Sequence, residues 1–297
     1  MSHRRDRGRA RLVPVTRDDA AVSPHDGETG VWGAAVKELG TAVAGFCVLV
    51  VIAAGGSAAL LLVAPGSTDR YFSWTLRPHA AAAMIGGLYL AAAVVFAWAL
   101  TLPWAQVRPL FVGVLGLTLP TLVLTMIHDH VFDFGRWQAV VWVVLFAGAP
   151  VSAVATLFAR RREVAGGAPV GAWSRAVLLA VSAILLALAV AVWIDSTRDD
   201  VSRAAPVQLI GLTGTYLGAW CSFAATLSAW AALRAHWDDA RLPLVALGAV
   251  AAGLMIAFAR VAGDLRHPVA TFAAKIALGA VAVIVYAANT PRRHGRC

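Results

Sequence analysis

The sequence predicts an all-α integral membrane protein with eight transmembrane helices. Its 297 residues are 60% hydrophobic and 14% charged, with a mean hydropathy of +0.73. These values exclude a water-soluble domain of this length. The apolar residues gather in eight nearly uncharged runs, each about 20 residues long and therefore able to cross a bilayer core. Arginines concentrate between alternate runs, which is typical of cytoplasmic loops.

The two ends of the chain are polar. Residues 1–35 are Arg-rich, contain several acidic residues and have no periodic apolar pattern. Such a composition cannot bury enough apolar surface to fold, so it predicts a disordered tail. A short basic tail, residues 291–297, follows the last apolar run.

The spans are predicted from the apolar runs in chain order. They cover residues 41–63, 80–102, 109–127, 137–159, 176–194, 207–231, 242–260 and 269–289. The third run contains Pro120 and the eighth contains Lys275. A proline is tolerated inside a span because neighbouring helices can satisfy the carbonyl group that it leaves free.

The orientation follows from the positions of the cationic residues. With the amino terminus inside, 17 of the 25 lysines and arginines lie in cytoplasmic segments and 7 in outer loops, while Lys275 lies within a span. The positive-inside rule then predicts a multi-pass protein of the cell (plasma) membrane with both termini in the cytoplasm. The formal charge of +9 records this orientation, so no nucleic-acid partner is expected.

The chain also contains an internal similarity. Gly87-Leu88-Tyr89-Leu90 in the second span matches Gly214-Thr215-Tyr216-Leu217 in the sixth, at an offset of 127 residues. An arginine and a Pro-Leu pair follow each stretch, at Arg108 and at Arg241. These matches predict two parallel four-helix repeats, residues 36–168 and 169–290. Chance similarity between helices rich in small residues is the alternative interpretation.

Polar residues at the outer membrane face form the first candidate site. His128, His130 and Asp133 lie in the loop after the third span, and Asp264 and His267 precede the eighth. Imidazole and carboxylate groups suit a divalent metal or an anionic headgroup site, whereas a solvated interfacial loop is the alternative. His128 and His130 are two residues apart and would point in different directions in a helix, so no metal is predicted.

Lys275 is the second candidate, because it is the charge that lies clearly inside a span. An intramembrane charge marks a functional site by default, although a lysine can also extend its ammonium group toward the headgroups. The sequence has no Gly-rich phosphate loop, GxSxG or HExxH motif. It therefore predicts no catalytic residue, cofactor or metal ion.

Three segments resemble a family of uncharacterised multi-pass membrane proteins from GC-rich, actinobacterial-type bacteria. They are Trp74-Thr75-Leu76-Arg77-Pro78, Gly86-Gly87-Leu88-Tyr89 and Leu124-Thr125-Met126-Ile127-His128. His128 and Phe132 fit the family pattern after the third span, while Asp129 stands in place of Leu and His130 in place of Asp. The resemblance covers the first half of the chain and implies a multi-pass fold without an established activity.

Two functions are consistent with these features. The first is a non-enzymatic membrane protein, either a transporter-like bundle or an assembly partner of other membrane proteins. The alternative is a membrane enzyme or accessory factor that acts on a lipid-linked or envelope substrate at the outer face. Besides the lipid bilayer, the expected partners are other membrane proteins or a small-molecule or lipid-linked ligand.

Overall fold

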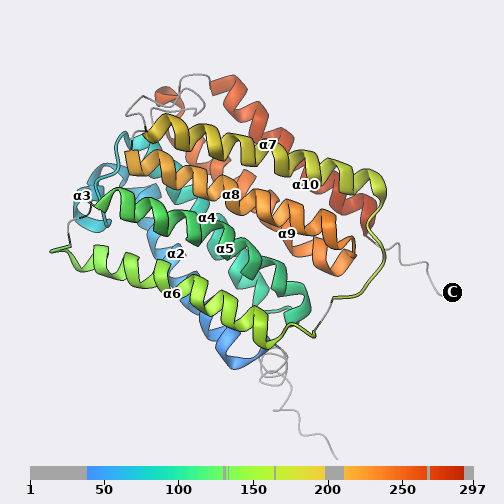
Figure 1. Cartoon of the computed structure of the whole chain (residues 1–297). Helices are drawn as coiled ribbons and strands as arrows, with labels where there is room; N and C mark the ends of the chain where they lie inside the picture. Colours follow the sequence, from blue (N-terminus) through green and yellow to red (C-terminus); the bar gives the residue numbers. More distant parts are fainter. Residues whose placement is uncertain are drawn as a thin grey trace, which may run out of the picture.

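The computed structural model describes residues 39–129, 132, 134–163, 165–197, 211–265 and 268–290, and nearly all of them are helical (Figure 1). The long helices are α2 (Thr41–Val63), α4 (His79–Ala99), α5 (Trp104–Ile127), α6 (Trp137–Ala159), α7 (Ala172–Thr197), α8 (Gly211–Arg234), α9 (Trp237–Arg260) and α10 (Pro268–Asn289). Within these described ranges, eight helices are long and apolar enough to cross a membrane, which confirms the predicted all-α membrane fold.

Shorter elements lie at one end of the bundle, which we call the outer end because it is predicted to face outside. They are η1 (Pro65–Ser67), α3 (Thr68–Tyr71) and η3 (Ala262–Asp264). Helices α2 and α6 have the predicted bounds, and Pro120 and Lys275 lie within continuous helices. The predicted tails, residues 1–35 and 291–297, lie outside the described residues.

Helix α5 begins five residues before its predicted start, because the predicted span began at Pro109. Pro103 takes the N-cap position, and the helix continues through Pro109. Pro109 is the sixth residue of α5 and removes one intrahelical hydrogen bond; within a bundle, neighbouring groups can satisfy the carbonyl that it leaves free. Trp104, the first residue of α5, is buried and thereby fixes this end of the helix against the bundle.

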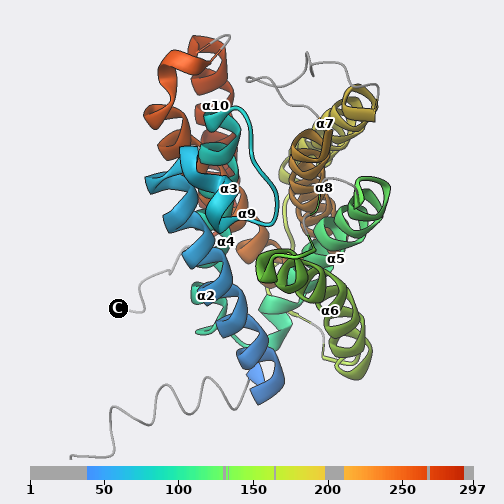
Figure 2. The ribbon, with the colours of Figure 1, turned by 90° about the vertical axis from the view of Figure 1, so that its left-hand side faces the viewer.

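The eight helices form two layers of four. In the first layer α2 packs on α4, α4 on α9 and α9 on α10. In the second layer α7 packs on α8, α8 on α5 and α5 on α6. The view from the outer end shows these layers side by side (Figure 2). They meet mainly where α9 contacts α8 and α5.

Each layer combines helices from both halves of the chain. The packing of α4 on α9 corresponds to the packing of α8 on α5, since these are the second and third spans of opposite halves. The Arg241 guanidinium lies 5.2 Å from the Trp98 ring, and the Arg108 guanidinium lies 5.4 Å from the Trp230 ring. Two parallel repeats that exchange their last two helices would produce this reciprocal pattern, although the division into residues 36–168 and 169–290 stays a prediction.

The inner end, opposite to the outer end, contains a buried acidic residue. Asp239 is 1% exposed, and its carboxylate accepts a hydrogen bond from Trp230 Nε1 at 3.2 Å. Arg234 Nε lies 3.7 Å from the same carboxylate. The neighbouring Asp238 accepts a weak hydrogen bond from Gln106 of α5 at 3.4 Å. The inner ends of the two layers are thus joined through polar side chains.

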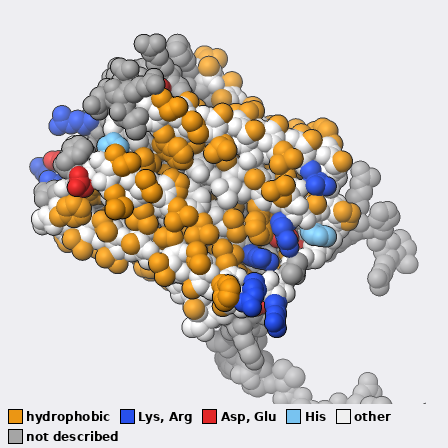
Figure 3. Space-filling model, in the orientation of Figure 1, with side chains coloured by type: hydrophobic (Ala, Val, Ile, Leu, Met, Phe, Trp, Pro, Cys, Tyr) orange, Lys and Arg blue, Asp and Glu red, His pale blue; other side chains and the backbone are white. Residues whose placement is uncertain are grey.

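The surface of the bundle matches a lipid environment. Large apolar side chains are exposed along the outer helices, for example Ile52 of α2, Val151 of α6 and Ile184 of α7. Figure 3 shows this apolar surface, with most of the visible lysine and arginine side chains toward the inner end at the lower right and others at the outer end at the left. An exposed apolar face of this extent is stable in contact with acyl chains and costly in water.

Candidate functional site

Two tyrosines at equivalent positions in the proposed repeats meet between the layers. Tyr89 belongs to α4 of the first layer and Tyr216 to α8 of the second. The Tyr216 hydroxyl donates a hydrogen bond to the Tyr89 hydroxyl at 2.9 Å. Tyr216 is 1% exposed and Tyr89 is partly exposed, so this hydrogen bond gives the buried Tyr216 hydroxyl a partner.

Three tryptophans surround this pair, and together the five residues Trp74, Tyr89, Trp142, Tyr216 and Trp220 form what we call the inter-layer cluster. The Tyr216 ring lies 5.0 Å from the ring of Trp142 on α6 and 6.0 Å from that of Trp74. Trp220 lies one turn further along α8, 6.4 Å from the Tyr216 ring. The cluster therefore collects aromatic rings from α4, α6, α8 and the loop that precedes α4.

Two indole N–H groups of this cluster do not form a hydrogen bond. Trp142 and Trp220 are both at least nine-tenths buried. The Trp142 Nε1 atom has no hydrogen-bond partner, and the Trp220 Nε1 atom lies near the Tyr216 hydroxyl without hydrogen-bond geometry. A buried donor without an acceptor costs about 1–3 kcal/mol, so such groups in a native structure call for an explanation, such as a ligand or a water molecule.

The loop before α4 covers the outer side of the cluster. Ser73 donates a hydrogen bond to the Gln138 carbonyl of α6 at 3.0 Å, and Trp74 Nε1 donates one to the Thr213 hydroxyl of α8 at 3.3 Å. The loop extends from the first layer and lies between the two layers (Figure 2). The Trp74 ring thus covers the outer side of the Tyr89–Tyr216 pair and contacts both α6 and α8.

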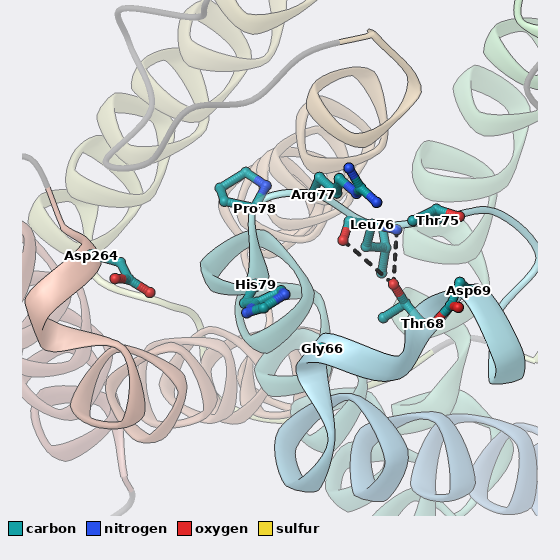
Figure 4. Close-up of a pocket in the computed structure, with 9 residues that line it drawn as sticks. All are labelled: Gly66, Thr68, Asp69, Thr75, Leu76, Arg77, Pro78, His79 and Asp264. Carbon is teal, nitrogen blue, oxygen red and sulfur yellow. Dashed lines mark hydrogen bonds between the residues drawn. The ribbon is translucent and has the colours of Figure 1, made fainter.

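A pocket of about 660 Å³ opens at the outer end beside this loop. It is lined by Gly66, Thr68, Asp69, Thr75, Leu76, Arg77, Pro78, His79 and Asp264 (Figure 4); we call it the outer pocket. Thr68 fixes one wall, because its hydroxyl accepts a hydrogen bond from the Leu76 N–H at 3.0 Å. The side chains of His79 and Asp264 approach from different elements, the start of α4 and η3.

The six sequence candidates do not form one cluster among the described residues. Asp264 lines the outer pocket with Arg77 and His79. His128 is buried, and its Nδ1 donates a hydrogen bond to the Leu124 carbonyl at 2.9 Å, at the end of α5. Lys275 lies on α10 and is partly exposed. His130, Asp133 and His267 lie outside the described residues.

Metal binding finds no support in the part of the chain that the structure describes, where no group of three His, Cys, Asp or Glu side chains is placed to hold an ion. Sequence reasoning noted the equivalent tyrosines but not the tryptophans around them. Trp74 and Trp142 lie far apart in the sequence, and each resembles an ordinary interfacial tryptophan. Only the matched offset of Tyr89 and Tyr216 pointed to this region.

Comparison of the chain with protein-family models, curated proteins and solved structures gave no match. The resemblance to the actinobacterial-type family is therefore not supported by them. The chain is therefore identified as a polytopic membrane protein with eight apolar helices among its described residues.

Proposed function

We propose that this protein is a non-enzymatic, transporter-like membrane protein that passes a small molecule between its two layers. The observation that carries the proposal is the inter-layer cluster, where buried and unsatisfied indole N–H groups lie beside a pair of tyrosine hydroxyls. Polar groups that face the interior of a membrane bundle commonly mark a substrate pathway. Sites at the interface between structural repeats are typical of transporters.

The cluster defines the chemistry of the molecule that it would accept. Its aromatic rings favour an apolar or planar body. The N–H groups of Trp142 and Trp220 are donors only, so the ligand must supply acceptor oxygens or nitrogens. The proposed substrate is therefore a small, largely apolar molecule that carries a hydrogen-bond acceptor.

Polar contacts between the layers close both ends of this pathway. At the outer end the layers are joined by Ser73 and Arg70 with Gln138 and by Trp74 with Thr213. At the inner end they are joined by Gln106 with Asp238, by Trp230 with the buried Asp239 and by Asn289 with Ser174. A neutral hydrogen bond is worth about 1 kcal/mol, and a contact of a buried carboxylate is worth more. We therefore expect the outer end to open more readily than the inner end, while the packing within each layer is retained.

The orientation is part of this proposal, with both termini in the cytoplasm of a cell-membrane protein. We expect a cysteine at position 71 to react with a membrane-impermeant maleimide in intact cells, because Tyr71 is exposed at the outer end. A cysteine at position 161, exposed at the inner end, should react only after permeabilisation. Both variants are made without Cys47, Cys221 and Cys297. The reverse labelling pattern would reject the orientation.

The transport proposal predicts opposite movements at the two ends of the bundle. Spin labels at positions 71 and 137 report the outer separation of the layers, and labels at 101 and 161 report the inner separation. All four positions are exposed. In lipid nanodiscs, double electron–electron resonance should give two distances for each pair of labels. Trp74→Ala should increase several-fold the population with the longer distance between positions 71 and 137. The reason is that the hydrogen bond of Trp74 with Thr213 stabilises the closed outer end by about 1 kcal/mol.

A pair within one layer provides the control for this measurement. Labels at Thr101 and Thr290, both at inner ends in the first layer, should give one distance that Trp74→Ala does not change. A single narrow distance for both inter-layer pairs, in the native chain and in Trp74→Ala, contradicts transport by movement of the layers. That result would favour a static assembly partner of other membrane proteins.

A second candidate function is a membrane enzyme or accessory factor that acts at the outer face. The outer pocket favours it, because His79, Arg77 and Asp264 converge there from separate elements. An imidazole beside a carboxylate is the usual pair for proton transfer. Each variant is expressed in cells that lack the native protein. If His79→Ala fails to restore the phenotype that is lost on deletion, while Trp74→Ala and Tyr216→Phe restore it, this function is favoured over transport.

A further inference from the structure

The outer pocket has walls of opposite charge. Arg77 and His79 lie on one side with the amino end of α4, and Asp264 lies across from His79 on η3 (Figure 4). Asp69 adds a second carboxylate beside Thr68 and Thr75. A ligand that satisfies the whole pocket must therefore carry both an anionic and a cationic group.

The first wall suits a phosphate group. Arginine binds phosphate through several N–H groups in a fixed geometry. The amino end of α4 has no side-chain cap at Pro78, so its free N–H groups add positive potential on the same side. Asp264 on the other wall is exposed and suits a primary ammonium group, which can donate hydrogen bonds to a carboxylate.

A small apolar hollow of about 20 Å³ lies beside this pocket, at the outer end of α2. It is lined by Ser57, Leu60, Leu61, Ala64, Thr68, Tyr71 and Phe72, and it shares Thr68 with the outer pocket. Leu60 and Val63 on this side of α2 are exposed large apolar residues. A charged pocket beside exposed apolar side chains of a membrane-spanning helix matches the two parts of a lipid molecule.

We propose that the outer pocket binds the headgroup of a zwitterionic aminophospholipid, whose acyl chains lie in the bilayer beside the exposed Leu60 and Val63 of α2. The phosphate lies against Arg77, His79 and the start of α4, and the ammonium group lies against Asp264. The pocket volume of about 660 Å³ is in the range of ligand sites, roughly 300–1,000 Å³. This site is separate from the inter-layer cluster, and lipid binding does not depend on transport.

The test uses the full chain in nanodiscs of phosphatidylglycerol, with soluble glycerophosphoethanolamine as the probe in a calorimetric titration. We expect the probe to bind, and both glycerol phosphate and ethanolamine to bind at least roughly tenfold more weakly, because each lacks one charged contact. Arg77→Ala and Asp264→Asn should each weaken probe binding by a similar factor. Arg70→Ala removes an exposed cation beside the pocket that does not line it and should leave binding unchanged.

A third variant fills the pocket without changing its charge. A Cβ atom on Gly66 would lie 3.4 Å from the His79 ring, so Gly66→Val should abolish probe binding while the protein remains folded. Nanodiscs that contain phosphatidylethanolamine should compete with the soluble probe. The proposal is overturned if glycerol phosphate binds as tightly as the probe, if the variants bind like the native chain, or if phosphatidylethanolamine does not compete.

Discussion

Gly253→Ala is expected to destabilise the protein strongly, because Gly253 of α9 and Gly87 of α4 lie in direct backbone contact. A Cβ atom at Gly253 would lie 3.0 Å from the carbonyl carbon of Gly87, and one at Gly87 would lie 2.8 Å from the carbonyl carbon of Gly253. These neighbours are backbone atoms, which cannot move without separating α4 from α9. We expect a loss of about 3 kcal/mol and a fall in Tm of about 6–10 °C.

Gly248→Ala is the matched control in the same helix. A Cβ atom at Gly248 has no atom within 4 Å, so alanine there should leave Tm unchanged or raise it through higher helix propensity. Thermal unfolding of the three purified chains in one detergent, followed by tryptophan fluorescence, measures the difference. If Gly253→Ala unfolds at the same temperature as Gly248→Ala, the close approach of α4 and α9 is wrong.

The close approach also illustrates what the sequence could and could not predict. Apolar runs gave the eight spans, because bilayer thickness fixes the length of a helix independently of its neighbours. They did not give the pairing of α4 with α9, which depends on contacts between residues more than 130 positions apart in the sequence. Gly86 faces Leu61 and Leu62 of α2, whereas the next residue, Gly87, faces α9. Two adjacent glycines thus serve different partners, a distinction that no sequence pattern contains.

The candidate sites were predictable to different degrees. Arg77, His79 and Asp264 could be placed at the outer face because their loops begin or end apolar runs. Their convergence in one pocket depends on how α4 and η3 are arranged within the first layer. Trp142 was not predicted, because its role comes from the lost hydrogen bond of its indole group. Such a property exists only in the folded chain.

Asp239→Ala is expected to have the second large effect on stability. The substitution removes the acceptor of the Trp230 indole N–H and leaves the Arg234 guanidinium beside a buried space. Breaking a fully buried pair costs about 3–5 kcal/mol. Arg234 is 36% exposed, so solvent reduces the penalty to about 2–3 kcal/mol. The expected fall in Tm is therefore about 4–9 °C.

Asp238→Ala separates the buried pair from the effect of charge at the helix end. Asp238 and Asp239 both lie in the first turn of α9, where a carboxylate stabilises the helix by about 0.3–1 kcal/mol. Asp238→Ala loses this contribution and a weak 3.4 Å hydrogen bond with Gln106, so its Tm should fall by only about 1–4 °C. Asp239→Asn keeps an acceptor for Trp230 and should lie between the two alanine variants. Equal Tm values for Asp238→Ala and Asp239→Ala would show that the buried carboxylate does not hold the inner ends of α8 and α9 together.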